Sequence, residues 1–118
     1  MTPVSEKIHY HGYSIRLQPG VRDAYIHYHQ NVWKEVEDTM RKAGVVEYRI
    51  FITGDDQLFS MIGFREGCDM ATFVKENKKV EACCRWDELM SPMQKKCDFA
   101  KENEWWAELP MVYDLNKE

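Results

Sequence analysis

Apolar and polar residues alternate along the first part of the chain with the two-residue period of a strand. The alternation runs from Tyr13 to Leu17, which predicts a strand with one buried face. Pro19 and Gly20 follow and end it. Residues 1–11 show no clear period and are expected to form a flexible lead-in. Residues 12–118 are then expected to form a single domain.

The period becomes helical between Val21 and Ala43. Spacing the residues by about 100° gathers the apolar and aromatic side chains into one stripe. The stripe consists of Tyr25, His29, Val32, Trp33, Val36, Met40 and Ala43. Gly44 follows, as glycine commonly does after a helix C-terminus. The pattern therefore predicts one helix over residues 21–43 that packs on a sheet.

Two further strands are predicted on either side of a turn. Residues 45–52 and 58–64 are rich in β-branched and aromatic residues, which suit a pleated sheet. The intervening Thr-Gly-Asp-Asp at 53–56 has the composition of a turn. The segment is predicted to be a β-hairpin. One face of its first strand would carry Val46, Tyr48, Ile50 and Ile52.

A second helical pattern and a final strand complete the chain. Residues 68–93 are predicted to be helical in two pieces, with a break near Asn77. In the second piece one side carries Cys83, Trp86, Met90 and Met93, with Asp87 at its margin. Residues 108–115 have enough apolar alternation for a last strand, and Pro110 indicates an edge position or a strand start.

The predicted order of elements is β, α, β, β, α, β. This is the ferredoxin-like α+β arrangement, a four-stranded antiparallel sheet with both helices on one face. The other face of the sheet would be bare, and its apolar side chains need a cover. A second copy packing sheet to sheet would supply that cover. We therefore expect a homodimer.

Length and composition limit the classes of function. A chain of 118 residues with 44% hydrophobic residues is large enough for one core. A net charge of −4 argues against a nucleic-acid partner, because such binding depends on clustered Lys and Arg. No apolar run approaches the roughly 20 residues that cross a bilayer, and the N-terminus lacks the layout of a signal peptide. We expect a cytoplasmic protein with no membrane partner.

The histidines of the first helix are candidates for metal ligands and for proton carriers. His27 and His29 would lie about 200° apart on a helix, so they cannot hold one ion together. No C-x-x-C motif is present, and the cysteines are expected to be reduced thiols used as small apolar side chains. We expect no bound metal. His29 lies in the middle of the apolar stripe, one turn from Tyr25 and from Trp33, where it could carry protons or be a core histidine held by one hydrogen bond.

Four ordered patterns resemble those of a known enzyme family. They are Y-x-x-x-H-x-x-x-W at 25–33, G-x-x-x-Y at 44–48, L-F-x-M at 58–61 and C-x-R-W-x-x-x-M at 83–90. Together they resemble the L-rhamnose mutarotase family over residues 13–115. Members of that family are dimeric ferredoxin-like enzymes, also described as dimeric α+β barrels. They interconvert the α and β anomers of a 6-deoxyhexose without cofactor or metal.

The resemblance implies a role for several residues of the first helix and the hairpin. It makes His29 the proton donor, and it makes Tyr25 and Tyr48 contacts to a 6-deoxyhexose such as L-rhamnose or L-fucose. Trp33, which closes the first pattern, would be a further contact. No cofactor is implied. Mutarotation needs an acid and a base together, and an imidazole can serve in either role near neutral pH.

The second helical region shows one departure from the family. Trp86 would contact the sugar, but the family typically has a second tryptophan where this chain has Asp87. A carboxylate there would make the pocket roomier and able to accept hydrogen bonds from sugar hydroxyls. Our hypothesis is that His29 protonates the ring oxygen while Asp87, or a water held by Tyr25, accepts the proton of the anomeric hydroxyl.

Two other classes of function and one sequence feature stay open. The chain could be a non-catalytic sugar-binding or interaction module that kept the pocket. It could also be a cofactor-free monooxygenase or dehydratase, since this fold hosts many functions. The adjacent Trp105 and Trp106 could pack at an interface, form a lid over the pocket or provide a platform for a sugar ring.

Overall fold

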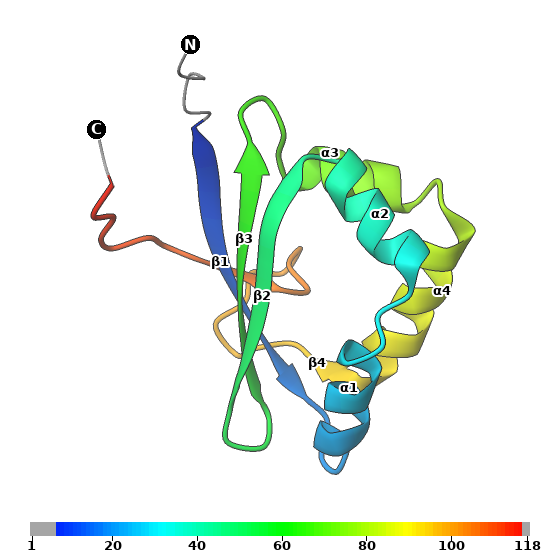
Figure 1. Cartoon of the computed structure of the whole chain (residues 1–118). Helices are drawn as coiled ribbons and strands as arrows, with labels where there is room; N and C mark the ends of the chain where they lie inside the picture. Colours follow the sequence, from blue (N-terminus) through cyan, green and yellow to red (C-terminus); the bar gives the residue numbers. More distant parts are fainter. Residues whose placement is uncertain (1–6, 117–118) are drawn as a thin grey trace.

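The computed structural model describes residues 7–116, in which an antiparallel sheet faces a layer of helices (Figure 1). The strands of this part of the chain are β1 (Ile8–Leu17), β2 (Val45–Thr53), β3 (Gln57–Arg65), β4 (Gln94–Lys95) and β5 (Ala107–Leu109). The helices are α1 (Arg22–His29), α2 (Lys34–Lys42), α3 (Met70–Asn77) and α4 (Glu81–Met90), and a short 3-10 turn spans Ser91–Met93.

The strand order confirms the ferredoxin-like prediction. β2 pairs with β3, β3 with β1, and β1 with β4, while β5 also pairs with β1; all these pairs are antiparallel. The predicted fold has a single last strand beside β1. Two short strands, β4 and β5, share that edge of the sheet. All four α-helices lie on the same side of the sheet (Figure 1).

The core lies between the sheet and the helices. Ile15, Leu17 and Leu58 of the sheet pack with Cys83 and Trp86 of α4 in one buried cluster. A second cluster consists of Ala43, Val45, Ile62, Phe64 and Phe73. The two-residue period of β1 and β3 explains this packing, because alternate side chains reach the same face. Burial of these side chains is the main force that holds α4 on the sheet.

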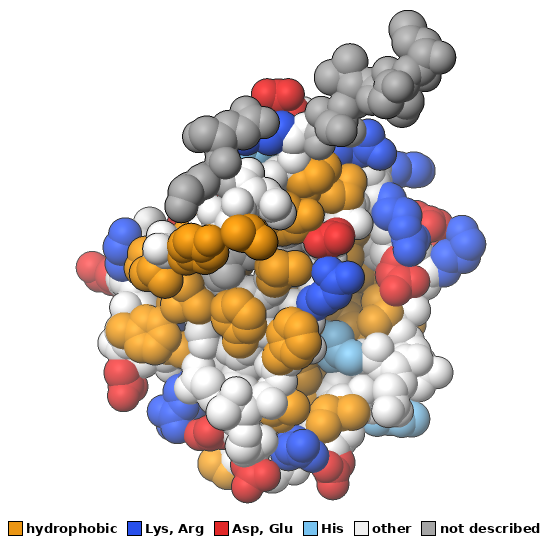
Figure 2. Space-filling model, turned by 60° about the vertical axis from the view of Figure 1, so that its left-hand side comes forward, with side chains coloured by type: hydrophobic (Ala, Val, Ile, Leu, Met, Phe, Trp, Pro, Cys, Tyr) orange, Lys and Arg blue, Asp and Glu red, His pale blue; other side chains and the backbone are white. Residues whose placement is uncertain are grey.

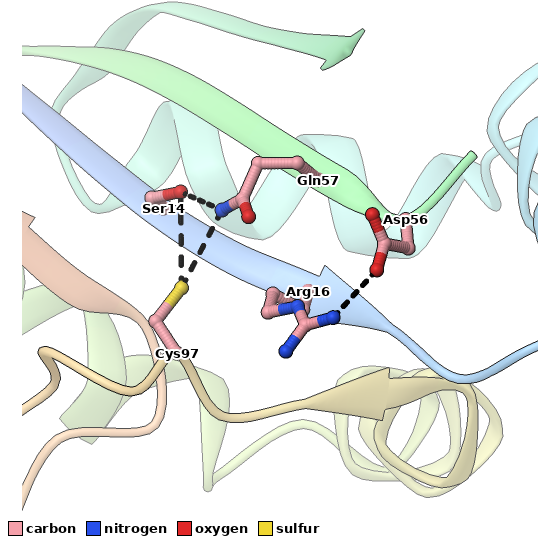
Figure 3. Close-up of polar contacts among 5 residues, drawn as sticks. All are labelled: Ser14, Arg16, Asp56, Gln57 and Cys97. Atoms are coloured by element: carbon pink, nitrogen blue, oxygen red, sulfur yellow. Dashed lines mark hydrogen bonds and ion pairs between the residues drawn. The ribbon is translucent and has the colours of Figure 1, made fainter. Parts of the chain in front are cut away.

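A polar cluster ties the segment after β4 to the sheet (Figure 3). The Gln57 amide donates to Ser14 Oγ at 2.6 Å and lies 3.5 Å from the sulfur of Cys97. Next to it, Arg16 forms an ion pair with Asp56 at 2.7 Å. Ser14 and Cys97 are both buried, so these contacts satisfy polar groups that water cannot reach.

The first strand begins earlier than the sequence pattern predicts. β1 starts at Ile8, so residues 8–11, which we assigned to a flexible lead-in, belong to the sheet. His9 pairs with Phe64 and His11 with Ile62 across the ladder to β3. Ile8 and Tyr10 alternate with histidines in the opposite phase to Tyr13, Ile15 and Leu17, so the pattern of one buried face does not continue through Gly12. The part of that lead-in over residues 1–6 lies outside the described residues.

The single helix predicted over residues 21–43 is wrong, because the chain breaks it into α1 and α2. The backbone of Trp33 is extended, with φ −64° and ψ 138°. Asn31 and Val32 in the gap are weak helix formers. The apolar residues keep the helical spacing along the sequence across the gap, so the periodicity conceals the break. The predicted break near Asn77, by contrast, is confirmed between α3 and α4.

The last predicted strand is also corrected. It covers Ala107–Leu109 and not residues 108–115, because Pro110 has no N–H to continue the ladder. The two-residue strand β4 was not predicted. It pairs Gln94 with Leu17 and is too short to produce an alternation that a pattern could reveal.

Gly44 is expected to be the least replaceable glycine of the fold. Its φ is +91°, and an added Cβ would collide with the side chain of Cys68. Left-handed backbone costs an L-residue about 1–2 kcal/mol and overpacking about 1–3 kcal/mol. Gly44→Ala should therefore lower the free energy of unfolding by about 2–5 kcal/mol, measured by urea denaturation.

The matched control is Gly54→Ala. Gly54 has φ +62° and open space around the position of a Cβ, so only the backbone term of about 1–2 kcal/mol applies. Equal losses for the two variants would show that the contact with Cys68 is absent in solution.

Candidate active site

A cavity of about 1030 Å³ lies between the sheet and the helices. Five of the six site residues predicted from the sequence line it. They are Tyr25 and His29 of α1, Tyr48 of β2, and Trp86 and Asp87 of α4. The curl of the sheet and the break after α1 bring these three elements around one space. The volume is that of a typical small-molecule site.

The imidazole of His29 is oriented by the backbone of its own helix. Its Nδ1 lies 2.9 Å from the carbonyl oxygen of Tyr25. A carbonyl can only accept a hydrogen bond, so Nδ1 carries a hydrogen in the neutral ring. The ring nitrogen that can gain or lose a proton is then Nε2. Burial lowers the pKa of His29 from its ordinary value, and the hydrogen bond to Tyr25 offsets part of that change.

Aromatic rings surround His29 on two sides. The ring centroid of Tyr25 lies 4.5 Å away, and that of Trp86 lies 5.5 Å away in an edge-on arrangement. His29 itself is half-buried. The histidine is therefore neither sealed in a dry core nor turned to bulk solvent, and it meets the geometric condition for a proton carrier.

Two tyrosine hydroxyls are held in the same cavity as donors. Burial raises the pKa of Tyr25, although a hydrogen bond from Gln94 opposes this. Tyr48 is 37% exposed as a residue, yet burial of its hydroxyl raises its pKa strongly, with further contributions from the neighbouring Tyr25 and Asp87. Both phenols therefore keep their protons at neutral pH, and each can donate to an oxygen of a ligand.

Asp87 supplies a carboxylate to the cavity. Burial raises the pKa of its carboxyl group, even though much of the residue is exposed. No other described residue forms an ion pair or hydrogen bond with this carboxylate. Its oxygens are therefore available to accept hydrogen bonds or a proton.

Trp33 lies differently from the other predicted residues. It is absent from the cavity lining, and its ring packs edge-on against Trp86 with centroids 5.2 Å apart. Trp33 thus contacts the indole of Trp86 without lining the cavity. The sequence pattern placed both residues on the apolar side of their helices but could not show which of them faces the cavity.

Gln94 was not predicted as a site residue, and the position of the Trp105–Trp106 pair was left open. Gln94, Trp105 and Trp106 all line the cavity. The Trp105 indole donates to Gln94 Oε1 at 2.7 Å, and Gln94 Nε2 donates to the Tyr25 hydroxyl at 3.0 Å. The tryptophan pair was a usable signal. Nothing in the sequence distinguishes Gln94 from other glutamines.

Metal ligands do not cluster in the described part of the chain. No group of three or more His, Cys, Asp or Glu residues within residues 7–116 is arranged to hold an ion. All four cysteines are free thiols. Among the same residues, no helix has the length and apolar character needed to cross a membrane.

The fold and the cavity define a ferredoxin-like α+β domain with one histidine in an aromatic, hydroxyl-lined pocket. The chain belongs to the L-rhamnose mutarotase family, because the family model described as L-rhamnose mutarotase matches residues 11–115. That match covers nearly all of the described residues and includes every residue of the candidate site.

Individual relatives agree with this assignment. A UPF0734 protein from Dictyostelium discoideum is 35% identical over 98 residues, which cover 80% of this chain and 78% of that protein. The L-rhamnose mutarotase of Burkholderia ambifaria is 39% identical over 51 residues, which are 42% of this chain and 49% of that enzyme. The L-rhamnose mutarotase of Listeria monocytogenes is 28% identical over 79 residues, covering 67% and 73%.

A solved structure supports the fold independently. The crystal structure of an L-rhamnose mutarotase from Formosa agariphila superposes with a TM-score of 0.68. The superposition covers 91% of this chain and 98% of that one, at 20% sequence identity. At this identity the similarity shows that the two chains share a fold.

Proposed function

We propose that this protein is a mutarotase that interconverts the α and β anomers of a 6-deoxyhexose, L-rhamnose or L-fucose. The observation that carries the proposal is the orientation of His29. Its Nδ1 is committed to the Tyr25 carbonyl, so Nε2 is left for a ligand in a cavity with two tyrosine hydroxyls and a carboxylate. Membership of the L-rhamnose mutarotase family supports the same class of substrate.

The reaction needs only proton transfers. Opening of the pyranose ring requires a proton on the ring oxygen while the anomeric hydroxyl loses its own. The aldehyde then closes from the other face. In our proposal His29 delivers the first proton through Nε2. Asp87, or a water held by Tyr25, accepts the second. Closure reverses the two transfers, so the pair returns to its starting state.

The remaining side chains would orient the sugar. Tyr25 and Tyr48 would donate hydrogen bonds to its oxygens. The Trp86 ring would stack on the C–H side of the pyranose, where it buries apolar area without requiring hydrogen bonds. Val32 and Met40 line the same cavity and could pack against the methyl group that distinguishes a 6-deoxy sugar.

The proposed reaction can be distinguished from simple sugar binding. The protein is titrated with L-rhamnose and L-fucose while its tryptophan fluorescence is followed, and anomer exchange is measured on the same samples by saturation-transfer NMR. A mutarotase binds a sugar and accelerates exchange. Binding with exchange at the spontaneous rate would favour the non-catalytic module and contradict the proposal.

The pH dependence of kcat/KM is expected to be bell-shaped. Donation requires the protonated imidazole of His29, whose pKa is lowered by burial, so the rate should fall as pH rises through that lowered pKa. Acceptance of a proton requires ionised Asp87, whose pKa is raised by burial, so the rate should also fall as pH drops through that raised pKa. Burial makes the imidazolium a stronger acid but reduces its population at neutral pH.

The profile is measured by NMR with the uncatalysed exchange subtracted at each pH. A kcat/KM that rises steadily between about pH 5 and 7, where a histidine loses its proton, would contradict donation. It would make His29 the proton acceptor in the ring-opening step.

We also propose that the protein is a homodimer that packs sheet to sheet. The face of the sheet opposite the helices exposes Phe51 and Phe59, which are 54% and 40% exposed and whose rings stack on each other. Hydrophobic side chains gather on this side of the molecule (Figure 2). Such a contiguous apolar surface is typical of a subunit interface.

Sedimentation velocity at micromolar concentration should therefore show a dimer. Phe51→Glu should shift the protein toward monomer, because it places a charge in the centre of the apolar face. Val74→Glu is the matched control, since Val74 is 43% exposed but lies on α3, on the helical side. A monomeric wild-type protein at this concentration would contradict the proposal.

A further inference from the structure

We propose that Gln94 and Trp105 are positioning residues that fix the hydroxyl of Tyr25 as a hydrogen-bond donor to an oxygen of the bound sugar. The inference rests on the proposed function, since it concerns how the same cavity recognises a 6-deoxyhexose. It adds that the hydroxyl hydrogen of Tyr25 is directed to an acceptor oxygen of the sugar.

Trp105 forms the outer end of a chain of hydrogen bonds that leads through Gln94 to Tyr25. The indole N–H of Trp105 lies 2.7 Å from the side-chain oxygen of Gln94. An indole N–H can only donate, so the atom facing it must be an acceptor. This contact determines which end of the Gln94 amide is the oxygen. The amide nitrogen must then point the other way, toward Tyr25.

The orientation of Gln94 determines the role of Tyr25. The amide nitrogen lies 3.0 Å from the Tyr25 hydroxyl in a buried contact. An amide NH₂ only donates, so the hydroxyl oxygen of Tyr25 accepts here. The hydroxyl hydrogen is not used in this contact, and no other described residue accepts it. Because Tyr25 lines the cavity, that hydrogen is left to donate to a ligand.

Backbone contacts hold Gln94 in place. Gln94 is 7% exposed and belongs to β4, where it pairs with Leu17 of β1. Its carbonyl also accepts a hydrogen bond of 3.3 Å from the Gln18 side chain. The short strand that the sequence did not reveal thus has a definite consequence, because it sets the position of the amide relative to α1.

The loop that carries Trp105 is held by the carboxylate of Glu104. The backbone N–H of Lys101 donates to one of its oxygens at 2.9 Å, and that of Glu108 donates to the other at 3.2 Å. These two bonds close the loop on both sides of the tryptophan. Trp105 is 44% exposed, yet its indole nitrogen is directed inward to Gln94.

The test is a double-mutant cycle of Gln94→Glu with Tyr25→Phe. The glutamate side chain has nearly the same size as glutamine, but both of its oxygens accept, so the Tyr25 hydrogen would turn toward the new carboxylate and be lost to the sugar. Each single change should lower kcat/KM and sugar affinity by about tenfold, the effect of one hydrogen bond. The double variant should lose little more than either single one.

Trp105→Phe, combined with Tyr25→Phe in the same way, provides a second test if Gln94→Glu folds poorly. It removes the N–H that orients the amide and keeps an aromatic ring. Its loss should be smaller than that of Gln94→Glu, and it should also largely disappear in the Tyr25→Phe background. The inference would be overturned if, in both cycles, the fold-loss of the double variant equalled the product of the two single fold-losses. A merely structural role for Gln94 or Trp105 would act independently of the Tyr25 hydroxyl and would give that product.

The readouts separate this inference from the proposed function. The cycle is run on the dissociation constant from tryptophan fluorescence as well as on the exchange rate. A protein that binds the sugar without accelerating exchange would overturn the proposed reaction alone, and a non-additive cycle on the dissociation constant would still support the inference. A protein that binds no 6-deoxyhexose would overturn both.

Discussion

His29→Ala is expected to reduce enzyme-catalysed anomer exchange by a factor on the order of 10² to 10⁴, the usual contribution of general acid–base catalysis. The variant removes the only imidazole that lines the cavity in the described part of the chain. Sugar binding should change far less than kcat, because the tyrosines and Trp86 that would hold the ligand are untouched. The rate is measured by saturation transfer between the two anomeric protons.

The matched control is His27→Ala. His27 is on the same helix but is exposed, so its removal should leave the exchange rate unchanged. Thermal unfolding of both variants would show whether α1 persists. An unaltered rate in a folded His29→Ala protein would remove His29 from the mechanism.

Asp87→Asn should lower kcat on the order of 10²-fold, with a much smaller change in KM. The amide matches the carboxylate in size but cannot take a proton at neutral pH, so it removes general-base catalysis, which contributes at least this much. Burial already raises the pKa of the Asp87 carboxyl group, which makes the carboxylate a better acceptor than an exposed one. The measurement is the exchange rate as a function of sugar concentration.

Asp87→Trp then distinguishes catalysis from sugar selection at this position. It restores the tryptophan that the family typically has next to Trp86. If Asp87 is the proton acceptor, the variant should be as slow as Asp87→Asn. A variant that keeps its kcat but changes its preference between L-rhamnose and L-fucose would assign Asp87 to selectivity. The water held by Tyr25 would then be the acceptor.

The fold could be predicted from the sequence because its determinants are local patterns. The hairpin formed by β2 and β3 has unbroken β-rich strands on either side of a three-residue turn, one residue shorter than predicted, and the structure places both strands where the pattern does. The pieces of the second helical region were separable because the polar residues around Asn77 interrupt the apolar stripe. Each of these signals lies within a few residues of the element that it specifies.

The features that were not predicted depend on contacts between distant residues. The apolar residues keep their helical spacing along the sequence across the gap between α1 and α2, so the periodicity of Tyr25, His29 and Val36 gives no sign of the break. β4 exists because Gln94 pairs with Leu17, which is 77 positions earlier in the numbering. A two-residue strand of this kind has no pattern of its own.

The sequence predicted which aromatic and histidine residues belong to the candidate site. The stripe placed Tyr25 and His29 on the buried side of one helix, and the structure agrees. The chemical roles came from the family patterns and not from periodicity. Trp86 lines the cavity and Trp33 does not. This difference could not be predicted from either source, because it depends on how α4 packs against the segment that joins α1 and α2.

Nε2 of His29 is expected to meet the ring oxygen of a pyranose bound in the cavity. A crystal structure of the protein soaked with L-rhamnose, and in parallel with L-fucose, tests it most directly. The account predicts a sugar between Trp86 and Tyr48 with its ring oxygen within hydrogen-bonding distance of that nitrogen. A sugar bound elsewhere on the protein, or one in the cavity whose ring oxygen faces away from His29, would contradict it.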